Sequence, residues 1–305
     1  MKRLPVLFAL GVLHNPAGAT HAVTHALGQT MVPDAPARIV TLFQGATDIT
    51  LALGVKPVAT VESWAEKPTY HYLRNQLQNV PVIGLETQPS LEDMARLKPD
   101  LIIGSTFRNE RVYDLLSYIA PTVAAREIFA FKENVRLIGA ALGRQDRATA
   151  LLEQFDQRIA KTRSLLEDKF RARWPLSAAI LDFRSDHVRV YLTDSFAGSI
   201  LSELQFRQPA KLGQSGWPLM KLTSKESMPV LDADVFFVML RDDNGAARRN
   251  YEDWSGHPLW QQLAAVKRHQ VYRVDPVAWS LAGGIISANQ MLDELGQRFL
   301  RAEAE

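Results

Sequence analysis

The sequence predicts an α/β protein made of two lobes that are joined by a single long α-helix. Three observations support this fold class. The 305 residues are enough for two domains of ordinary size. Short β-branched runs alternate with helical stretches in both halves of the chain, which is the pattern of sheets covered by helices. Between the halves, the stretch 146–173 contains neither Pro nor Gly, and as a helix it would be about 40 Å long.

The composition narrows the possible functions. Lys and Arg number 35 against 33 Asp and Glu, a net charge of +2, so we expect no broad basic surface for nucleic acid. The chain has no cysteine, which excludes disulfides, thiolate metal sites and a cysteine nucleophile. An apolar fraction of 47% with 22% charged residues is typical of a folded globular protein.

Residues 1–19 are predicted to be a signal peptide. Lys2 and Arg3 precede the apolar run 4–13, and the small residues 17–19 resemble a cleavage site. As a helix this apolar run would be about 15 Å long, too short to span a membrane. We therefore expect export, cleavage near Thr20, and a product that is soluble outside the cytoplasm. With no cysteine to acylate, this product should carry no lipid anchor.

Residues 20–144 are predicted to form the N-terminal lobe. Its strands are expected at 38–42, 57–61, 100–105 and 122–125, and its helices at 46–53, 90–97, 111–119 and 132–142. Ser90 and Asp93 are spaced as in a capping box at the start of one of these helices, and Pro99 ends it. Because strands and helices alternate, the strands should be parallel.

A linking helix is predicted at 145–174 and a C-terminal lobe at 175–305. The strands of that lobe are expected at 178–183, 188–192, 235–240 and 270–274, and its helices at 197–204, 225–231, 258–263 and 286–301. The polar tract 241–250 should be a loop. A joint made of one rigid helix should allow only a small closure of the lobes.

An arginine or a tryptophan stands just past the end of five predicted strands. These residues are Trp64, Arg108, Arg184, Arg241 and Trp279. Ligands of such sheets bind in the crevice at the carboxyl ends of the strands, so the five side chains should converge on one rim of an interlobe cleft. Arginine offers planar donors to carboxylates and other oxyanions, and aromatic rings supply an apolar wall. The sequence therefore predicts a binding site for an anion.

None of the common catalytic motifs is present in the sequence. The stretch 213–217 lacks the final glycine of a G-x-S-x-G motif, and neither a phosphate-binding glycine loop nor an H-E-x-x-H zinc motif occurs. His21 and His25 have an i, i+4 spacing, but so near the expected mature terminus they should fray rather than bind a metal. We expect a binding protein without a metal site of its own, and not an enzyme.

Several stretches, taken in order, resemble the periplasmic substrate-binding proteins of iron–siderophore ABC transporters, in particular the ferric dicitrate and ferric hydroxamate binders. They are HALGQT (25–30), PARIVTL (36–42), IGLETQPSLEDMARLKPD (83–100), YDLLSYIAPTV (113–123), KEN (132–134), FAGSIL (196–201), LDAD (231–234), PLW (258–260) and VYRVDPVAW (271–279). They are distributed over nearly the whole mature chain. The resemblance implies the class III fold of two Rossmann-like lobes and one linking helix.

The resemblance also implies a function. The protein would capture a ferric siderophore of anionic carboxylate or hydroxamate type in the cleft and deliver it to the permease dimer of an ABC transporter. The siderophore would hold the iron, so no covalent cofactor is expected, and the protein should be a periplasmic monomer. The implied ligand-binding positions are Arg108, Arg184, Trp217 and Trp279, with Tyr191 and Arg241 as neighbours. Tyr191 is equally compatible with a place in the core.

Two glutamates are implied to dock on arginines of the permease. Glu92 lies in the P-S-L-E sequence, and Glu226 has the corresponding position in the other lobe. Each precedes a motif that contains aspartate, at 98–100 and at 231–234. The alternative for either glutamate is an ordinary solvated side chain on an exposed helix.

Three other interpretations stay open. Direct binding of haem or ferric ion would use Tyr70, His71 or Tyr72 as ligands, although these residues also fit an amphipathic connector. Cobalamin binding is disfavoured by the arginines at the rim. A hydrolase in the cleft would require catalytic residues that no motif identifies.

Overall fold

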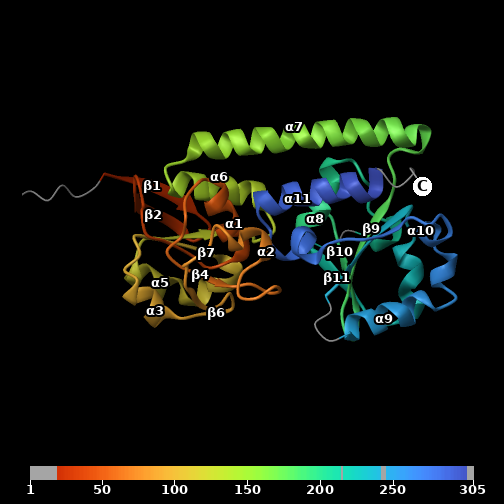
Figure 1. Cartoon of the computed structure of the whole chain (residues 1–305), viewed down its shortest axis with the longest axis horizontal. Helices are drawn as coiled ribbons and strands as arrows, with labels where there is room; N and C mark the ends of the chain where they lie inside the picture. Colours follow the sequence, from red (N-terminus) through yellow and green to blue (C-terminus); the bar gives the residue numbers. More distant parts are fainter. Residues whose placement is uncertain (1–18, 214–215, 242–244, 301–305) are drawn as a thin grey trace, which may run out of the picture.

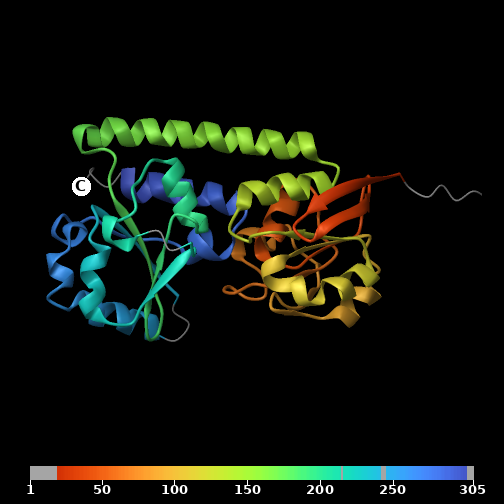
Figure 2. The ribbon, with the colours of Figure 1, turned by 180° about the vertical axis from the view of Figure 1, so that it is seen from behind.

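The protein consists of two α/β lobes with a long helix lying along one side of both (Figure 1). The computed structural model describes residues 19–213, 216–241 and 245–300. The predicted signal peptide at 1–19 therefore lies outside the described residues, apart from Ala19. Seen from behind, the two lobes lie side by side beneath the helix (Figure 2).

The N-terminal lobe contains a hairpin, two small sheets and the helices that cover them. The hairpin pairs β1 (Thr20–His25) with β2 (Gly28–Pro33). One sheet has the parallel order β3 (Ile39–Thr41), β7 (Leu101–Ser105), β8 (Thr122–Ala125). The other has the order β4 (Thr60–Glu62), β5 (Val82–Leu85), β6 (Gln88–Pro89). The helices are α1 (Gln44–Ala52), α2 (His71–Arg74), α3 (Leu91–Arg96), α4 (Thr106–Asn109), η1 (Glu110–Val112), α5 (Tyr113–Ile119) and α6 (Phe131–Ala141).

The β1–β2 hairpin orders the two histidines that were expected to fray. His21 Nδ1 lies 2.9 Å from an Asp34 carboxylate oxygen, and its Nε2 lies 2.8 Å from the carbonyl oxygen of Ala140. His25 Nε2 lies 2.9 Å from the hydroxyl of Thr30. The expectation of fraying was wrong because the hairpin gives both imidazole rings partners. Within the described ranges, no group of three or more His, Asp or Glu side chains is arranged to hold a metal ion.

The C-terminal lobe is built on one five-stranded sheet with the order β11-β10-β9-β12-β13. Its strands are β9 (Ala178–Phe183), β10 (Val188–Tyr191), β11 (Leu219–Leu222), β12 (Val235–Leu240) and β13 (Val271–Arg273). Its helices are α8 (Phe196–Glu203), η3 (Ala210–Leu212), η4 (Lys225–Leu231), α9 (Ala246–Ser255), η5 (Trp260–Gln262), α10 (Ala264–Lys267), η6 (Val277–Leu281), α11 (Ile285–Leu295) and η7 (Gly296–Leu300).

The strand directions of this lobe differ from those of the β3-β7-β8 sheet, and one expectation for the lobe was wrong. The sheet is mixed, because β10 runs antiparallel to both β9 and β11. The link 184–187 between β9 and β10 is too short for the crossover that parallel neighbours require. The tract 241–250 is not all loop, since α9 begins at Ala246.

The long helix α7 (Gln145–Phe170) is followed by the turn η2 (Arg171–Arg173), close to the predicted bounds. Beneath it, the largest apolar cluster continues from one lobe into the other. The ring of Phe131 on α6 lies 5.2 Å from that of Phe155 on α7 and 5.4 Å from that of Phe196 on α8. The two lobes and the helix therefore share a core.

A second contact between the lobes lies at the start of α11. The buried carboxylate of Asp48, on α1, accepts hydrogen bonds from the backbone N–H groups of Ile286 (2.8 Å) and Ser287 (3.0 Å). It also accepts one from the hydroxyl of Tyr72 (2.7 Å). A carboxylate at this position satisfies N–H groups that a helix start leaves unpaired and interacts favourably with the helix dipole. The lobes are thus held together by α11 as well as by α7.

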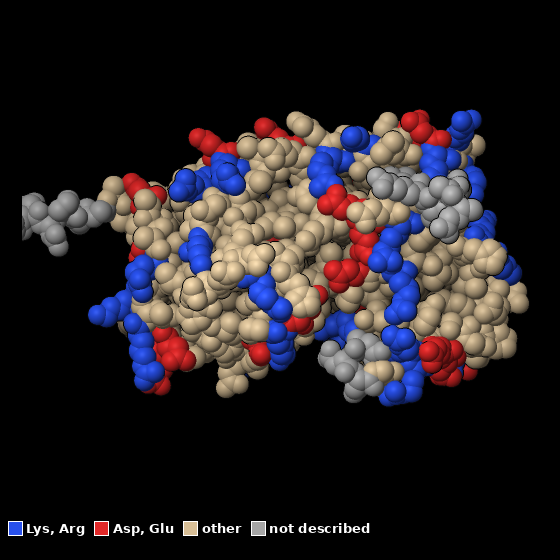
Figure 3. Space-filling model, in the orientation of Figure 1, with Lys and Arg blue, Asp and Glu red and all other residues tan. Residues whose placement is uncertain are grey.

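The surface carries charges of both signs. Figure 3 shows basic and acidic side chains interspersed over the face in view, with no single broad patch of either sign. None of the helices in the described part of the chain combines the length and the apolar character needed to cross a bilayer.

Candidate functional site

The N-terminal lobe presents Arg108 directly after β7. The short helix α4 begins there, and the hydroxyl of Ser105 caps it by accepting a hydrogen bond from the Arg108 backbone N–H. Arg108 Nε donates to a carboxylate oxygen of Glu86 at 2.8 Å. Its guanidinium carbon lies 5.2 Å from the ring centre of Trp64 and 4.6 Å from that of Phe107. Arg108 is therefore fixed by one carboxylate and two aromatic rings.

Glu86 is only 3% exposed although it is charged. Besides Arg108, it accepts hydrogen bonds from the indole Nε1 of Trp64 (3.2 Å) and from the backbone N–H of Gln44 (3.3 Å). Three donors on one buried carboxylate satisfy the requirement that a buried charge be paired and hydrogen-bonded. The cluster thus brings together the predicted Trp64 and Arg108 through a residue that was not predicted.

The C-terminal lobe presents Arg184 directly after β9. Its Nη1 lies 3.6 Å from a carboxylate oxygen of Asp182, a fully buried residue at the end of the strand. The hydroxyl of Tyr191 donates to the same oxygen at 3.4 Å and accepts from Ser280 at 2.8 Å. Tyr191 is half-buried and also packs against the core, so it combines both of the roles considered for it.

Arg241 belongs to the same polar cluster. Its pKa is lowered, first by burial and then by the positive charge of Arg184, while Asp182 opposes that change. Burial raises the pKa of Asp182, and the nearby Arg184 and Arg241 oppose the rise. These mutual effects place two arginines around one buried carboxylate.

The two polar clusters lie close to one tyrosine between the lobes. Burial raises the pKa of Tyr70, and the charges of Glu86 in one lobe and Arg241 in the other both act on it. Tyr70 also bonds across the lobes, since its hydroxyl donates to the carbonyl oxygen of Leu281 at 3.2 Å.

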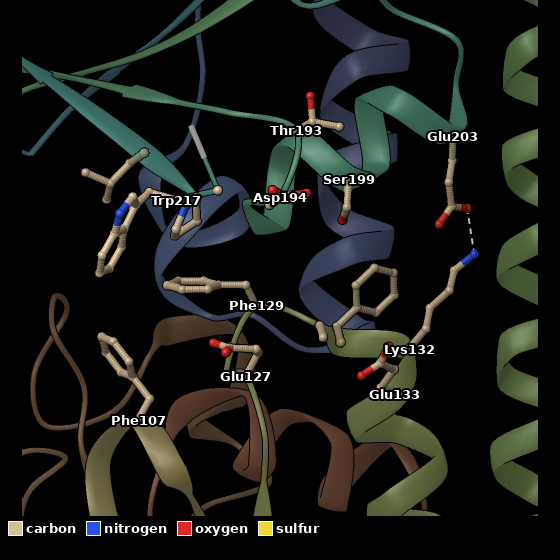
Figure 4. Close-up of a pocket in the computed structure, with 15 residues that line it drawn as sticks. Phe107, Glu127, Phe129, Lys132, Glu133, Thr193, Asp194, Ser199, Glu203 and Trp217 are labelled. Atoms are coloured by element: carbon tan, nitrogen blue, oxygen red, sulfur yellow. Dashed lines mark hydrogen bonds and ion pairs between the residues drawn. The ribbon is translucent and has the colours of Figure 1, made fainter. Parts of the chain in front are cut away.

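A cavity of about 780 Å³ opens between the lobes (Figure 4). The residues that line it are Phe107, Glu127, Phe129, Ala130, Phe131, Lys132, Glu133, Thr193, Asp194, Ser199, Glu203, Gly216, Trp217, Pro218 and Leu219. Trp217 is 71% exposed. Because Phe107 lines the cavity and also lies against Arg108, the N-terminal arginine adjoins this space.

Lys132 connects three elements at one side of the cavity. Its Nζ lies 2.6 Å from a carboxylate oxygen of Glu203 on α8 and 2.6 Å from one of Asp156 on α7 (Figure 4 shows the bond to Glu203). Lys132 is thereby neutralised by two carboxylates. Of the predicted ligand-binding residues, Trp217 lines this cavity, whereas Arg108, Arg184 and Arg241 are not among its lining residues.

Trp279 is the predicted rim residue that the structure places elsewhere. It is 1% exposed, its ring lies 4.7 Å from that of Phe237, and its Nε1 donates to Glu294 at 3.0 Å. The chain after β13 turns inward through η6, and this turn buries the indole in the core instead of presenting it to the cleft.

The residues considered as iron ligands do not form an open site. Tyr70 is 1% exposed and donates to the carbonyl oxygen of Leu281 at 3.2 Å. The hydroxyl of Tyr72 is bound to Asp48. His71 is exposed and pairs with Glu66 at 3.3 Å. The three neighbouring side chains thus have separate partners.

Sequence reasoning missed Glu86, Asp182 and the aromatic residues Phe107 and Phe129. Asp182 could have been recognised, because a charge inside the apolar run 178–183 is unusual for a buried strand. Glu86 lies in a turn with no local signal, since its donors come from residues 22 and 42 positions away.

The comparisons agree with this architecture. Residues 39–278 match the family model described as periplasmic binding protein. The chain is 52% identical over 263 residues to the achromobactin-binding periplasmic protein of Dickeya dadantii, covering 86% of each chain. It is 38% identical to the probable siderophore-binding lipoprotein YfiY of Bacillus subtilis, over 93% of this chain and 89% of the relative.

A solved structure is similar as well. The crystal structure of Staphylococcus aureus SirA complexed with staphyloferrin B superposes with a TM-score of 0.88 at 41% identity, covering 91% of this chain and 98% of SirA. These relatives are binding proteins and not enzymes. The family match over most of the sequence, together with relatives of this identity and coverage, shows that the chain belongs to the periplasmic binding protein family.

Proposed function

We propose that this protein captures a ferric siderophore with anionic carboxylate or hydroxamate groups in the interlobe cleft and delivers it to an ABC permease dimer in the inner membrane. The observation that carries the proposal is the set of arginines at the cleft, backed by buried carboxylates. Arg108 lies between Trp64 and Phe107 in one lobe, and Arg184 lies near Arg241 in the other. The names of the relatives that bind achromobactin and staphyloferrin B support the ligand class.

The chemistry of the site fits such a ligand. A siderophore supplies the iron ligands itself, so the protein has to recognise an oxygen-rich anionic surface. Guanidinium groups do this through charge-assisted hydrogen bonds. The volume of about 780 Å³ lies within the range of small-molecule sites, and the exposed rings of Phe107 and Trp217 give it apolar walls.

Delivery of the siderophore to the permease also requires exposed residues that can contact the permease. Glu92, in the first turn of α3, has a side chain that is 75% exposed and lies 2.5 Å from Arg96. Glu226, at the start of η4, is exposed and accepts a hydrogen bond from Ser224. We assign these two glutamates to docking on the permease. We also take the protein to be a soluble periplasmic monomer without a lipid anchor, because the chain has no cysteine to acylate.

Native mass spectrometry with a panel of ligands tests the proposal. The panel contains ferric staphyloferrin B, ferric citrate, a neutral ferric hydroxamate, haem and cobalamin. We expect one-to-one complexes with the anionic ferric chelates and weaker complexes, or none, with the others. Binding of haem or cobalamin alone would contradict the proposal.

A further inference from the structure

Each lobe presents an arginine on a buried carboxylate. Glu86 is 3% exposed and contacts Arg108 Nε, and Asp182 is fully buried and lies 3.6 Å from Arg184 Nη1. Burying an ionised carboxylate is costly unless it is paired, and such groups concentrate at functional sites. The burial of both carboxylates also leaves them little surface with which to touch a ligand.

In the N-terminal lobe, the carboxylate fixes the arginine from behind. Glu86 binds the Nε edge of the Arg108 guanidinium, and no hydrogen bond to a described residue engages the two terminal nitrogens. The other carboxylate oxygen of Glu86 is held by Trp64 and Gln44, so this anchor is itself fixed. The terminal nitrogens remain for an oxyanion, for which the fork of a guanidinium is suited.

In the C-terminal lobe, the pair of Asp182 and Arg184 leaves some of its polar atoms without hydrogen bonds within the described part of the chain. Among the described residues, Asp182 Oδ1 and Arg184 Nη1 are buried polar atoms without a hydrogen bond. Unpaired buried polar atoms are costly, so a ligand oxygen that reaches Arg184 would remove part of that cost. Burial raises the pKa of Asp182, and the positive charge of Arg184, whose Nη1 lies 3.6 Å from the carboxylate, opposes the rise.

We infer that Glu86 and Asp182 are positioning residues of the anion site: Glu86 fixes the guanidinium of Arg108 before a ligand arrives, and Asp182 is the counter-ion of Arg184. The inference rests on the proposed function, because it takes these arginines to be the groups that recognise the ligand. Glu86 and Asp182 would affect ligand binding indirectly, by orienting the arginine side chains that contact the ligand.

The two possible roles of these carboxylates predict opposite changes in affinity. If they were only nearby negative charges, replacing them by isosteric amides would make the cleft more positive, and an anionic chelate would bind more tightly. If they position the arginines, the same replacements weaken binding. Loss of an outer residue that orients a ligating side chain typically costs about 10- to 100-fold in affinity at metal sites, and we expect a similar range here.

Binding of ferric staphyloferrin B to Glu86→Gln, measured by titration calorimetry, is the direct test. We expect affinity to fall by about tenfold or more. In an Arg108→Ala background, the same change should have less than about a twofold further effect, because Glu86 would act through Arg108. Glu86→Asp keeps the charge but shortens the side chain, so it should weaken binding as the amide does. Tighter binding by Glu86→Gln, or an undiminished effect in the Arg108→Ala background, would overturn the assignment.

Asp182→Asn separates positioning from structural support. The amide keeps the size of the side chain and removes its charge, and a melting temperature near that of the wild type shows that the variant is folded. We expect weaker binding of ferric staphyloferrin B by this stable variant. Unchanged affinity would overturn the role of Asp182.

Two structural carboxylates, Asp100 just before β7 and Asp234 just before β12, lie at the ends of these strands opposite to Arg108 and Arg241 and serve as matched controls. Asp100 accepts hydrogen bonds from the backbone N–H groups of Ala37 and Arg38, and Asp234 accepts one from Ser177. Asp100→Asn and Asp234→Asn should lower the melting temperature without changing affinity. If they weaken binding as much as the cleft variants do, the effect of Glu86 and Asp182 is general destabilisation and the inference is wrong.

An NMR measurement without ligand tests the role of Glu86 independently of the proposed function. The indole N–H of Trp64 donates to Glu86, so its NMR signal, assigned with Trp64→Phe, should shift in Glu86→Gln and stay in place in Asp100→Asn. If the wild-type protein binds no ferric siderophore, the proposed function fails, and this signal still reports whether Glu86 holds the cluster. A signal that Glu86→Gln leaves in place would overturn the positioning role.

Discussion

The carboxylate of Asp48 in the N-terminal lobe accepts a hydrogen bond from the backbone N–H of Ser287 in the C-terminal lobe at 3.0 Å. Together with the bond from Ile286, it makes a residue of one lobe the N-terminal cap of a helix that belongs to the other. Because α1 packs against α11, this contact holds the lobes together in addition to the connection through α7.

The Asp48 contact should make stability depend on pH. Burial raises the pKa of Asp48 from 3.8 to about 6. Between these values the folded protein holds a proton that the unfolded chain has lost, so this group's contribution to stability falls as the pH rises from about 4 to about 6 and is constant above. The shift corresponds to about 3 kcal/mol in the free energy of unfolding.

Urea unfolding of wild type and Asp48→Asn at several pH values measures this contribution. The difference between the two proteins should change across that window in the stated direction, because the amide does not titrate. Asp156→Asn, a change at a surface carboxylate, is the control for a general charge effect. A wild-type minus Asp48→Asn difference that rises with pH would contradict the prediction.

The lobes should approach each other by only a few degrees when ligand binds. The segment Gln145–Phe170 contains neither Pro nor Gly, and sharp bends in helices usually need such residues or a π-bulge. The Asp48 contact adds a second constraint. Small-angle scattering with and without ferric staphyloferrin B should give nearly equal radii of gyration, and a large decrease on binding would show that the joint is a hinge.

Arginine variants should lose affinity for anionic chelates. Arg108→Ala or Arg184→Ala should cost about 2 to 5 kcal/mol of binding free energy if the partner carboxylate of the ligand stays buried, and much less if the site is wet. Arg147→Ala is a matched control, because this exposed arginine of α7 donates to the carbonyl oxygen of Ala52. Equal affinities of all three variants and wild type would show that the arginines are not part of the site.

Tryptophan fluorescence should report ligand through Trp217 and not through Trp279. Trp217 is 71% exposed and lines the cavity, whereas Trp279 is 1% exposed in the core. Ferric chelates quench nearby indoles, so Trp217→Phe should remove much of the quenching that ferric staphyloferrin B causes. Trp279→Phe should leave that quenching in place; if it abolishes the signal while the variant stays folded, the cleft extends to η6.

Glu92 and Glu226 should matter for uptake and not for binding. Exposed ion pairs are worth about 0 to 1 kcal/mol, so the two glutamates should contribute mainly to orientation and association rate at the permease. Ala or Arg at either position should leave siderophore affinity and melting temperature nearly unchanged while slowing growth that depends on the siderophore, and the double variant should be worse. Normal uptake by the double variant, or loss of ligand binding in solution, would count against docking.

Much of the fold could be predicted because its signals are local. The helix expected at 90–97 is α3, and Ser90 caps it by accepting a hydrogen bond from the Asp93 backbone N–H at 3.2 Å. The long helix follows from a stretch without Pro or Gly, β12 from an apolar run of six residues, and β9 from a run of six that is apolar except for Asp182. The antiparallel place of β10 could have been predicted, because no helix was expected between the strands 178–183 and 188–192 and so short a link joins antiparallel strands.

The site was less predictable because its geometry depends on contacts between distant residues. A position just past a strand predicted that Arg108 and Arg184 lie at the rim of the cleft, but it could not show that Glu86 and Asp182 hold them. The same rule placed Trp279 at the rim, whereas a bond to Glu294, fifteen residues later, keeps it inside. Burial depends on the whole fold, so the spacing of residues along the sequence is not enough to predict it.

The close approach of the lobes at α11 also restricts how the sequence can vary. A Cβ on Gly284 would overlap the carboxylate of Asp48, and a Cβ on Gly45 would come within 2.6 Å of the carbonyl oxygen of Gly283. Substitution of Gly45 therefore requires a shift of backbone in the opposite lobe, and substitution of Gly284 requires displacement of the Asp48 side chain. Chimaeras that combine the N-terminal half of one relative with the C-terminal half of another should fold only when the two halves bring compatible residues at 45, 48 and 284.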